Sequence, residues 1–154
     1  TSVLETKTRL NHSERDDLYD ERINPIATFP GQGTVVWGQK TLQGRASALD
    51  RVNIRRLLIK IKKFIASASK YIVFEQNTST TRTAFLNITE PYLETVQQQS
   101  GLSAFRVIMD DTNNPADVVD RNRLVGQIYL QPTRTAEFII LDFVIQPTGA
   151  SFPE

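Results

Sequence analysis

The sequence has no cysteine and only one histidine among its 154 residues. Without cysteine, the chain has no disulfide bond, no thiolate ligand for a metal and no cysteine nucleophile. The single histidine, His12, lies in a polar segment, and no cluster of Cys, His and carboxylate residues has the spacing of metal ligands. We therefore predict neither a metal site nor a cofactor, and we expect His12 to be a solvated side chain.

The sequence also lacks a long apolar run. No stretch approaches the roughly 20 apolar residues that a membrane-spanning helix needs. Residues 1–22 are polar and charged, unlike a signal peptide. The net charge of +1 gives no general attraction to a membrane surface, so we expect no membrane partner. Because the chain begins with Thr1 and not with Met, we expect a processed protein or a piece of a longer one.

Motifs that signal an enzyme are scarce. The run Asp110–Asn114 lacks the alternating spacing and the final Glu of a calcium loop, and therefore indicates Asx turns after a strand. Gly31-Gln32-Gly33 is half of a phosphate-binding pattern, but no helix start follows it to present backbone amides to an anion. The sequence shows no nucleophile elbow, no paired catalytic carboxylates and no triad order. We predict a protein without enzyme activity.

The hydrophobic pattern predicts an α+β fold: a mixed β-sheet packed by two main helices, with a C-terminal antiparallel hairpin and extended terminal arms. Apolar residues recur at helical spacing over 52–69 and over 80–99, where Pro91 predicts a kink or a restart. The predicted strands cover residues 34–37, 71–74, 105–109, 124–130 and 136–145, with a short helix near 13–19 and a polar loop at 110–120.

The last predicted strand, residues 136–145, is apolar on both faces. Alternate side chains of a strand point to opposite faces. One face carries Ile139, Leu141, Phe143 and Ile145, and the other carries Phe138, Ile140, Val144 and a single charge, Asp142. A strand of this kind must be covered on both faces, and it is an aggregation hazard unless something pairs with it. The pattern therefore predicts assembly.

The first long helix is strongly basic. Between residues 51 and 74 the chain has seven basic residues and no acid, namely Arg51, Arg55, Arg56, Lys60, Lys62, Lys63 and Lys70. From Arg55 onward they lie opposite the apolar stripe, with Ile59 among them. Such a face is either a solvated surface or a contact with an acidic partner, because ordinary surface helices mix charges of both signs. The acidic partner is either nucleic acid or an acidic protein surface. This face has no interleaved aromatic residues and the chain outside it is net acidic, so we expect no nucleic-acid partner.

Several collinear blocks resemble the contractile tail sheath proteins of tailed bacteriophages, with the greatest similarity to those of T-even-type phages. The blocks are Ile23–Ile26, Phe29–Gly33, Val36–Leu42, Val52–Leu57, Val73–Asn77, Val125-Gly126 and Pro132–Ile139. The resemblance covers residues 23–142 and only the C-terminal part of those longer proteins. It departs at Thr81–Phe85, where family members often carry a Trp, and in the more basic first helix.

The resemblance implies a structural subunit that stacks as hexameric rings into a helical sheath around the inner tail tube. Contraction of that sheath drives the tube through the host envelope without catalysis. The implied partners are further copies of the chain, the tail tube protein, and the baseplate and tail terminator proteins, in the virion and, during assembly, in the host cytoplasm. The inner position implied for this part makes the basic helix face a tube-facing candidate, through Arg55, Arg56, Ile59, Lys62 and Lys63.

The family also implies that arm strands add to the sheets of neighbouring subunits, so that backbone hydrogen bonds join the copies. The inter-subunit strand candidates are Phe138, Ile140, Asp142, Phe143, Val144 and Ile145. We accordingly divide the chain into an arm or linker at 1–22, a sheath C-terminal domain at 23–142 and a C-terminal arm at 143–154. The alternative function is a nucleic-acid-binding α+β module that uses the basic helix 52–70.

Overall fold

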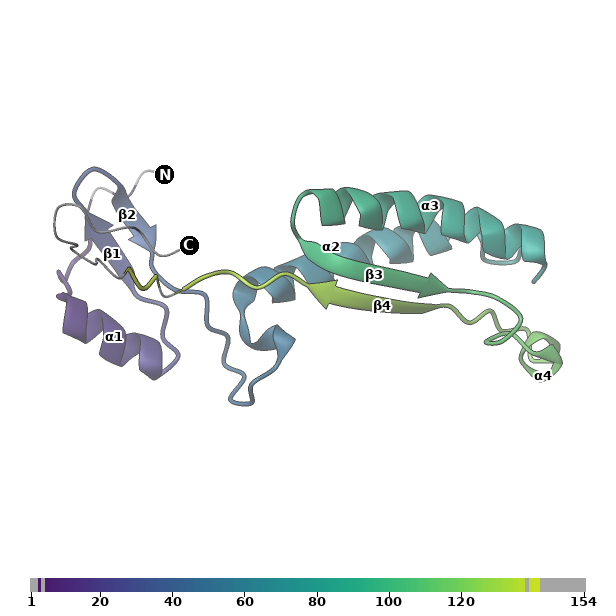
Figure 1. Cartoon of the computed structure of the whole chain (residues 1–154), viewed down its shortest axis with the longest axis horizontal. Coiled ribbons are helices and arrows are strands. Elements are labelled where there is room, and N and C mark those ends of the chain that lie inside the picture. The colour runs from purple at the N-terminus through teal and green to yellow at the C-terminus, as the bar shows by residue number, and fades with distance from the viewer. Residues whose placement is uncertain (1–2, 4, 138, 142–154) are drawn as a thin grey trace, which may run out of the picture.

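The computed structural model describes residue 3, residues 5–137 and residues 139–141, and it has two lobes joined by extended segments (Figure 1). The small lobe contains helix α1 (His12–Asp20) and strands β1 (Ile26–Phe29) and β2 (Gly33–Val36). The remaining elements form the large lobe, and they are η1 (Ala48–Asp50), α2 (Val52–Ser69), α3 (Ser79–Gln98), β3 (Leu102–Ile108), α4 (Ala116–Asp120) and β4 (Gln127–Pro132).

The elements of the small lobe are specified by residues close together in the sequence, through a helix cap and a tight turn. Helix α1 is capped by Asn11, whose side chain accepts from the backbone N–H of Glu14 while the Glu14 side chain accepts from that of Asn11. The predicted short helix is thereby confirmed. Strands β1 and β2 pair antiparallel, with Phe29 opposite Gly33. Gly31 and Gly33 both have positive φ, at 82° and 77°, which a glycine adopts readily in a tight turn.

The large lobe has two layers, with α2 and α3 packed on one face of the β3–β4 sheet (Figure 1). The core of this lobe consists of Ile61, Leu93, Val96 and Leu102, surrounded by the partly buried Leu57, Ile65, Tyr92, Phe105, Val107, Ile128 and Leu130. The rings of Phe64 and Tyr92 stack with centroids 3.7 Å apart and join the two helices. Helix α2 buries Ile54, Ile61 and Ala68, so the predicted apolar stripe faces the core.

Helix α3 runs through Pro91 as one helix from Ser79 to Gln98 rather than restarting there. A proline inside a helix removes one backbone N–H and so leaves the carbonyl four residues earlier, that of Asn87, without its helical partner. Both Pro91 and Asn87 lie on the exposed face of α3, where water can bind this carbonyl. The proline is therefore tolerated without a break.

The α+β class is confirmed, but the strands form two separate two-stranded antiparallel sheets instead of one mixed sheet. Strand β4 pairs antiparallel with β3. The predicted C-terminal hairpin between β4 and residues 136–145 falls partly on residues that lie outside the described part of the chain. Within that segment the described residues 136, 137 and 139–141 have no strand structure, and residues 138 and 142–145 lie outside the described residues.

Two shorter segments also differ from the prediction. Residues 71–74 form turns rather than a strand, because the N–H groups of Tyr71 and Ile72 donate to the last carbonyls of α2 and continue its winding. The predicted polar loop at 110–120 ends in the short helix α4. None of the helices in the described part of the chain is long and apolar enough to cross a membrane.

Candidate self-assembly surfaces

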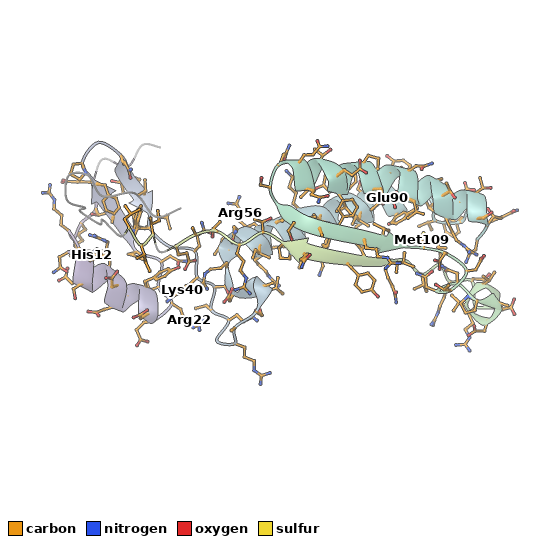
Figure 2. The ribbon with its side chains drawn as sticks, in the orientation of Figure 1. His12, Arg22, Lys40, Arg56, Glu90 and Met109 are labelled. Carbon is orange, nitrogen blue, oxygen red and sulfur yellow. The ribbon has the colours of Figure 1, made fainter. Side chains whose placement is uncertain are left out.

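The basic face of α2 is exposed. Every tube-facing candidate, namely Arg55, Arg56, Ile59, Lys62 and Lys63, lies on the exposed side of the helix, opposite the buried stripe. Figure 2 labels Arg56 near the start of this helix. None of the ion pairs found within the described residues involves these four basic side chains. The structure therefore presents an exposed positive strip with one apolar residue, Ile59, inside it.

The β3–β4 sheet has an outer face that no element of the described chain covers. Burial alternates along β4, with Ile128 and Leu130 turned toward the helices and Tyr129 exposed on the other side. Arg106 lies opposite Tyr129 in the register and is likewise exposed. Because the described sheet has only two strands, each strand has one edge whose backbone groups are free to pair with another strand.

The segment that follows the sheet exposes large apolar side chains. Ile139, Ile140 and Leu141 are 80%, 85% and 70% exposed. Of the inter-subunit strand candidates, Ile140 is thus accessible, while Phe138 and the four candidates from Asp142 to Ile145 lie outside the described residues. Three consecutive exposed large apolar residues are unusual on a protein surface, where such side chains are normally exposed singly.

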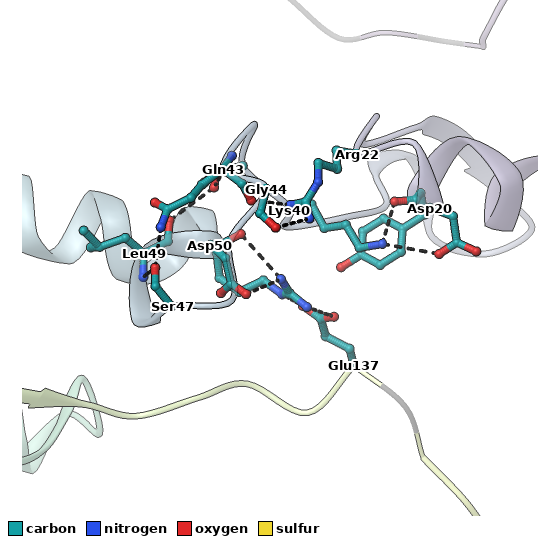
Figure 3. Close-up of polar contacts among 12 residues, drawn as sticks. Asp20, Arg22, Lys40, Gln43, Gly44, Ser47, Leu49, Asp50 and Glu137 are labelled. Atoms are coloured by element: carbon teal, nitrogen blue, oxygen red, sulfur yellow. Dashed lines mark hydrogen bonds and ion pairs between the residues drawn. The ribbon is translucent and has the colours of Figure 1, made fainter.

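An ion-pair cluster holds the base of this segment (Figure 3). Arg51, at the start of α2, donates from Nε to one Glu137 oxygen at 2.5 Å and from Nη2 to the other at 3.1 Å. Its third nitrogen, Nη1, lies 3.2 Å from the Asp50 carboxylate. Glu137 is the last described residue before the gap at 138, so this bidentate pair ties the C-terminal segment to α2.

A neighbouring contact ties the two lobes together. The Lys40 ammonium donates to the Tyr19 carbonyl at 2.7 Å, lies 4.0 Å from the centre of the Tyr19 ring and is 3.4 Å from the Asp20 carboxylate (Figure 3). Asn24 adds two hydrogen bonds of 2.9 Å to the backbone of Lys40. Helix α1 and the segment that leads to the large lobe are therefore held by a cation over an aromatic ring and by short hydrogen bonds.

The surroundings of this cluster shift the pKa values of Glu137 and Tyr19. Burial by itself raises the pKa of the Glu137 carboxyl, but hydrogen bonds from Arg51 and the Tyr19 hydroxyl, and the charges of Arg51 and Lys40, outweigh burial and hold that pKa below its ordinary value of 4.5. Burial, and then the hydrogen bond with Glu137, raise the pKa of Tyr19. Folding therefore favours an ionised Glu137 beside a neutral Tyr19.

Replacing Glu137 with glutamine (Glu137→Gln) should lower the free energy of unfolding by about 1–2 kcal/mol at pH 7, because Arg51 loses a charge-assisted bidentate partner. The pKa of Glu137 is lower in the folded chain than in the unfolded chain. Its contribution is therefore complete above pH 4.5 and is lost as the pH falls through the folded-state value. Urea unfolding of both proteins at pH 7 and pH 3 should show a smaller difference at pH 3 than at pH 7. Glu5→Gln, at an exposed site, is the matched control, and an equal effect at both pH values would contradict the assignment to charge.

The Asp110–Asn114 run forms turns, as the sequence indicates. The Thr112 N–H donates to the Asp110 carboxylate at 2.9 Å, and hydrogen bonds from Thr112 hold the Asp110 pKa below its ordinary value.

Asn114 is buried and bridges to Val125 through two hydrogen bonds of 2.7 and 2.8 Å. No group of three or more potential metal ligands occurs among residues that the structure describes.

Two ion pairs that join distant segments are not predicted by the sequence patterns. One is Arg51 with Glu137, which are 86 positions apart. The other is Arg82 with Asp111, in which the buried Arg82 also donates to the Asn77 side chain at 2.8 Å. A sequence signal exists for Arg82, because it lies one turn from the buried Phe85 on the apolar face of α3, where an unpaired arginine is rare.

These observations describe an α+β module with free sheet edges, an exposed apolar segment and a positive helix face. Residues 45–146 match the family model described as the phage tail sheath C-terminal domain, and the chain belongs to this family. The match spans every element of the large lobe, from η1 to β4.

Two curated relatives are tail sheath proteins. That of Vibrio phage KVP40 is 46% identical over 145 residues, which cover 94% of this chain and 22% of the relative. That of Enterobacteria phage T4 is 40% identical over 153 residues, which cover 99% of this chain and 23% of the relative. The chain therefore spans less than a quarter of the length of these relatives.

Two solved structures share the fold. A chain of the contracted helical sheath of the anti-feeding prophage has a TM-score of 0.78 at 26% identity, over 94% of this chain and 42% of that one. A chain of the six-fold symmetrised baseplate of the same prophage has a TM-score of 0.80 at 26% identity, over 91% of this chain and 41% of that one. Both are chains of multi-subunit contractile assemblies.

Proposed function

We propose that the chain is the inner, C-terminal part of a contractile tail sheath subunit, with a structural and not an enzymatic role. The observation that carries this proposal is an exposed apolar segment, Ile139–Leu141, together with sheet edges that the described residues leave unpaired, in a member of the sheath family. An edge and an extended apolar segment are complementary when they belong to different copies. The relatives' names and the helical sheath with the same fold support this role.

In this role the subunits stack as hexameric rings into a helical tube in the virion, after assembly in the host cytoplasm. The tail tube lies inside, and the baseplate and tail terminator proteins bind the two ends. Contraction drives the tube through the host envelope by repacking the subunits, with no chemical step. The baseplate chain of similar fold supports contact with a baseplate.

The strand candidates Phe138, Ile140, Asp142, Phe143, Val144 and Ile145 join copies by adding to a neighbour's sheet. In this arrangement residues 23–142 form the sheath domain, residues 143–154 form the C-terminal arm and residues 1–22 form the other arm. Backbone hydrogen bonds supply the attraction, and the alternation of side chains sets the register. The Arg51–Glu137 pair holds the segment that leads to the C-terminal arm.

The basic face of α2, with Arg55, Arg56, Ile59, Lys62 and Lys63, contacts an acidic surface of the tail tube. Exposed ion pairs contribute about 0–1 kcal/mol each. A contact made of such pairs is strong enough, over many subunits, to seat the sheath on the tube. Each pair is also weak enough to break when the sheath contracts.

Ending the chain after Ile140 is expected to abolish assembly while the two lobes still fold. The core cluster around Leu93 uses no residue beyond Leu130, so thermal unfolding by circular dichroism should change little. Electron microscopy should show tubes or rings for the full-length parent and none for the shortened one. A matched control that removes only residues 151–154 should assemble.

Two outcomes of this truncation would overturn the proposal. Complete unfolding of the shortened protein would place the segment in the chain's own core. Normal tubes from the shortened protein would show that the segment does not join the copies.

A further inference from the structure

We propose that the loop Tyr71–Phe74 of one copy inserts into an apolar groove at the opposite end of α2 in the next copy. This contact rests on the proposed function, because it requires self-assembly. It adds a side-chain contact of the knob-in-groove type to the strand exchange described above, and it makes the two ends of the large lobe into a complementary pair.

The loop is an exposed apolar knob. Tyr71 is 82% exposed and Val73 is 57% exposed, while Phe74 is fully exposed. Phe74 also has a φ of 74°, in the left-handed region that bulky residues rarely adopt. Strain of this kind persists only where the surrounding structure imposes it, and it is concentrated at binding and switch sites. Here its result is an aromatic ring presented to the outside at the α2–α3 connection.

The groove has a volume of about 230 Å³ and a lining that is almost entirely apolar. Its walls come from η1, the first half of α2 and the adjoining ends of the two sheet strands, with Leu49, Leu57, Leu58, Leu102 and Pro132 among the lining residues. An apolar cavity of about 150 Å³ already holds a benzene ring. The groove is therefore large enough for the ring of a phenylalanine and apolar enough to favour it over water.

The knob and the groove cannot meet within one copy. Helix α2 has 18 residues, and a helix rises about 1.5 Å per residue, so about 27 Å of rigid helix separates its two ends. Figure 1 shows α2 running from η1, near the small lobe, toward α4 at the far end of the large lobe. A Phe74 ring that fills the groove must therefore come from a second copy of this chain. Because different surfaces meet, the contact is heterologous, and repeated heterologous contacts build rings or helical tubes. A chain with the same fold comes from a helical sheath, which is the kind of assembly that repeated heterologous contacts build.

Cysteine cross-linking tests this contact directly, since the chain has no cysteine of its own. Glu75→Cys lies beside the knob and keeps Phe74, while Ala48→Cys lies in the groove wall and replaces one small side chain with another. A disulfide requires Cα atoms within about 4.4–6.8 Å. Mixing the two variants under mild oxidation during assembly should give the mixed dimer at least tenfold above a mixture of Gln32→Cys with Ala48→Cys. Adding Phe74→Ala to the Glu75→Cys variant should lower the mixed dimer at least tenfold.

The outcomes separate this contact from the proposed function. Tubes or rings without the mixed dimer would overturn the knob-in-groove contact and leave the sheath role standing. A protein that forms no oligomers and no mixed dimer would overturn both. Mixed dimers between Val144→Cys and Ala48→Cys, in place of those from Glu75→Cys, would make the C-terminal segment the occupant and overturn the contact. Cross-linking that survives Phe74→Ala would also overturn it.

Discussion

Replacing Leu93 with alanine (Leu93→Ala) is expected to lower the free energy of unfolding by about 3–5 kcal/mol. Leu93 is 0% exposed and lies in the core cluster with Ile61, Val96 and Leu102. The substitution removes three carbon atoms from the point where both long helices meet the sheet. The two-stranded sheet cannot collapse fully into the cavity, because its backbone is held by the β3–β4 pairing. The loss is a large part of the about 5–15 kcal/mol that stabilises a typical domain.

Urea unfolding followed by circular dichroism measures this loss. Leu42→Ala provides a matched control, since Leu42 is 91% exposed and the same atoms are removed from water rather than from a core. The control should change the free energy of unfolding by no more than about 0.5 kcal/mol. A loss below about 1 kcal/mol for Leu93→Ala would mean that α3 does not pack on the sheet.

Local sequence patterns predict the helices well. The apolar stripe of α2 emerges with Ile54 and Ile61 buried and the basic residues exposed, because a helix face depends only on residues three and four positions apart. The basic face therefore follows from the order of residues alone. The partner of this face does not follow from the sequence, since a positive strip attracts nucleic acid and acidic proteins alike.

Strand pairing is harder to predict. Residues 71–74 have a β-rich composition, yet they lie directly after α2 and form turns with no partner strand in the described chain. Strand β3 could pair with either of the two later β-rich segments by composition alone. The choice of β4 depends on which side chains reach the helices, and this packing has no signature in the local sequence. The Arg51–Glu137 pair escapes prediction for the same reason, because it joins residues 86 positions apart.

The final prediction concerns the basic face of α2. Reversing four charges, with Arg55→Glu, Arg56→Glu, Lys62→Glu and Lys63→Glu, is expected to weaken binding to the tail tube by about 10- to 100-fold. Each exposed ion pair contributes about 0–1 kcal/mol, each reversal adds repulsion, and every 1.4 kcal/mol corresponds to a factor of about ten. Because all four side chains are exposed on the face away from the core, folding and ring formation should be unchanged. Co-sedimentation of assembled sheath protein with purified tubes, over a range of salt concentrations, measures the loss.

A control with the same change in net charge separates a local contact from a general effect. Reversal of the exposed Arg9, Arg45, Arg121 and Arg123 should leave tube binding within a few-fold of the unmodified protein. Equal losses in both variants would mean that total charge matters and that α2 has no special role. A DNA-binding assay separates the sheath protein from the alternative, a nucleic-acid-binding module. Such a module would bind DNA with a steep salt dependence, and the α2 reversal would remove that binding. If the full-length parent stays monomeric and binds DNA tightly, the result favours the nucleic-acid-binding module. If tube binding is lost only with the α2 reversal, this helix face is the contact between sheath and tube.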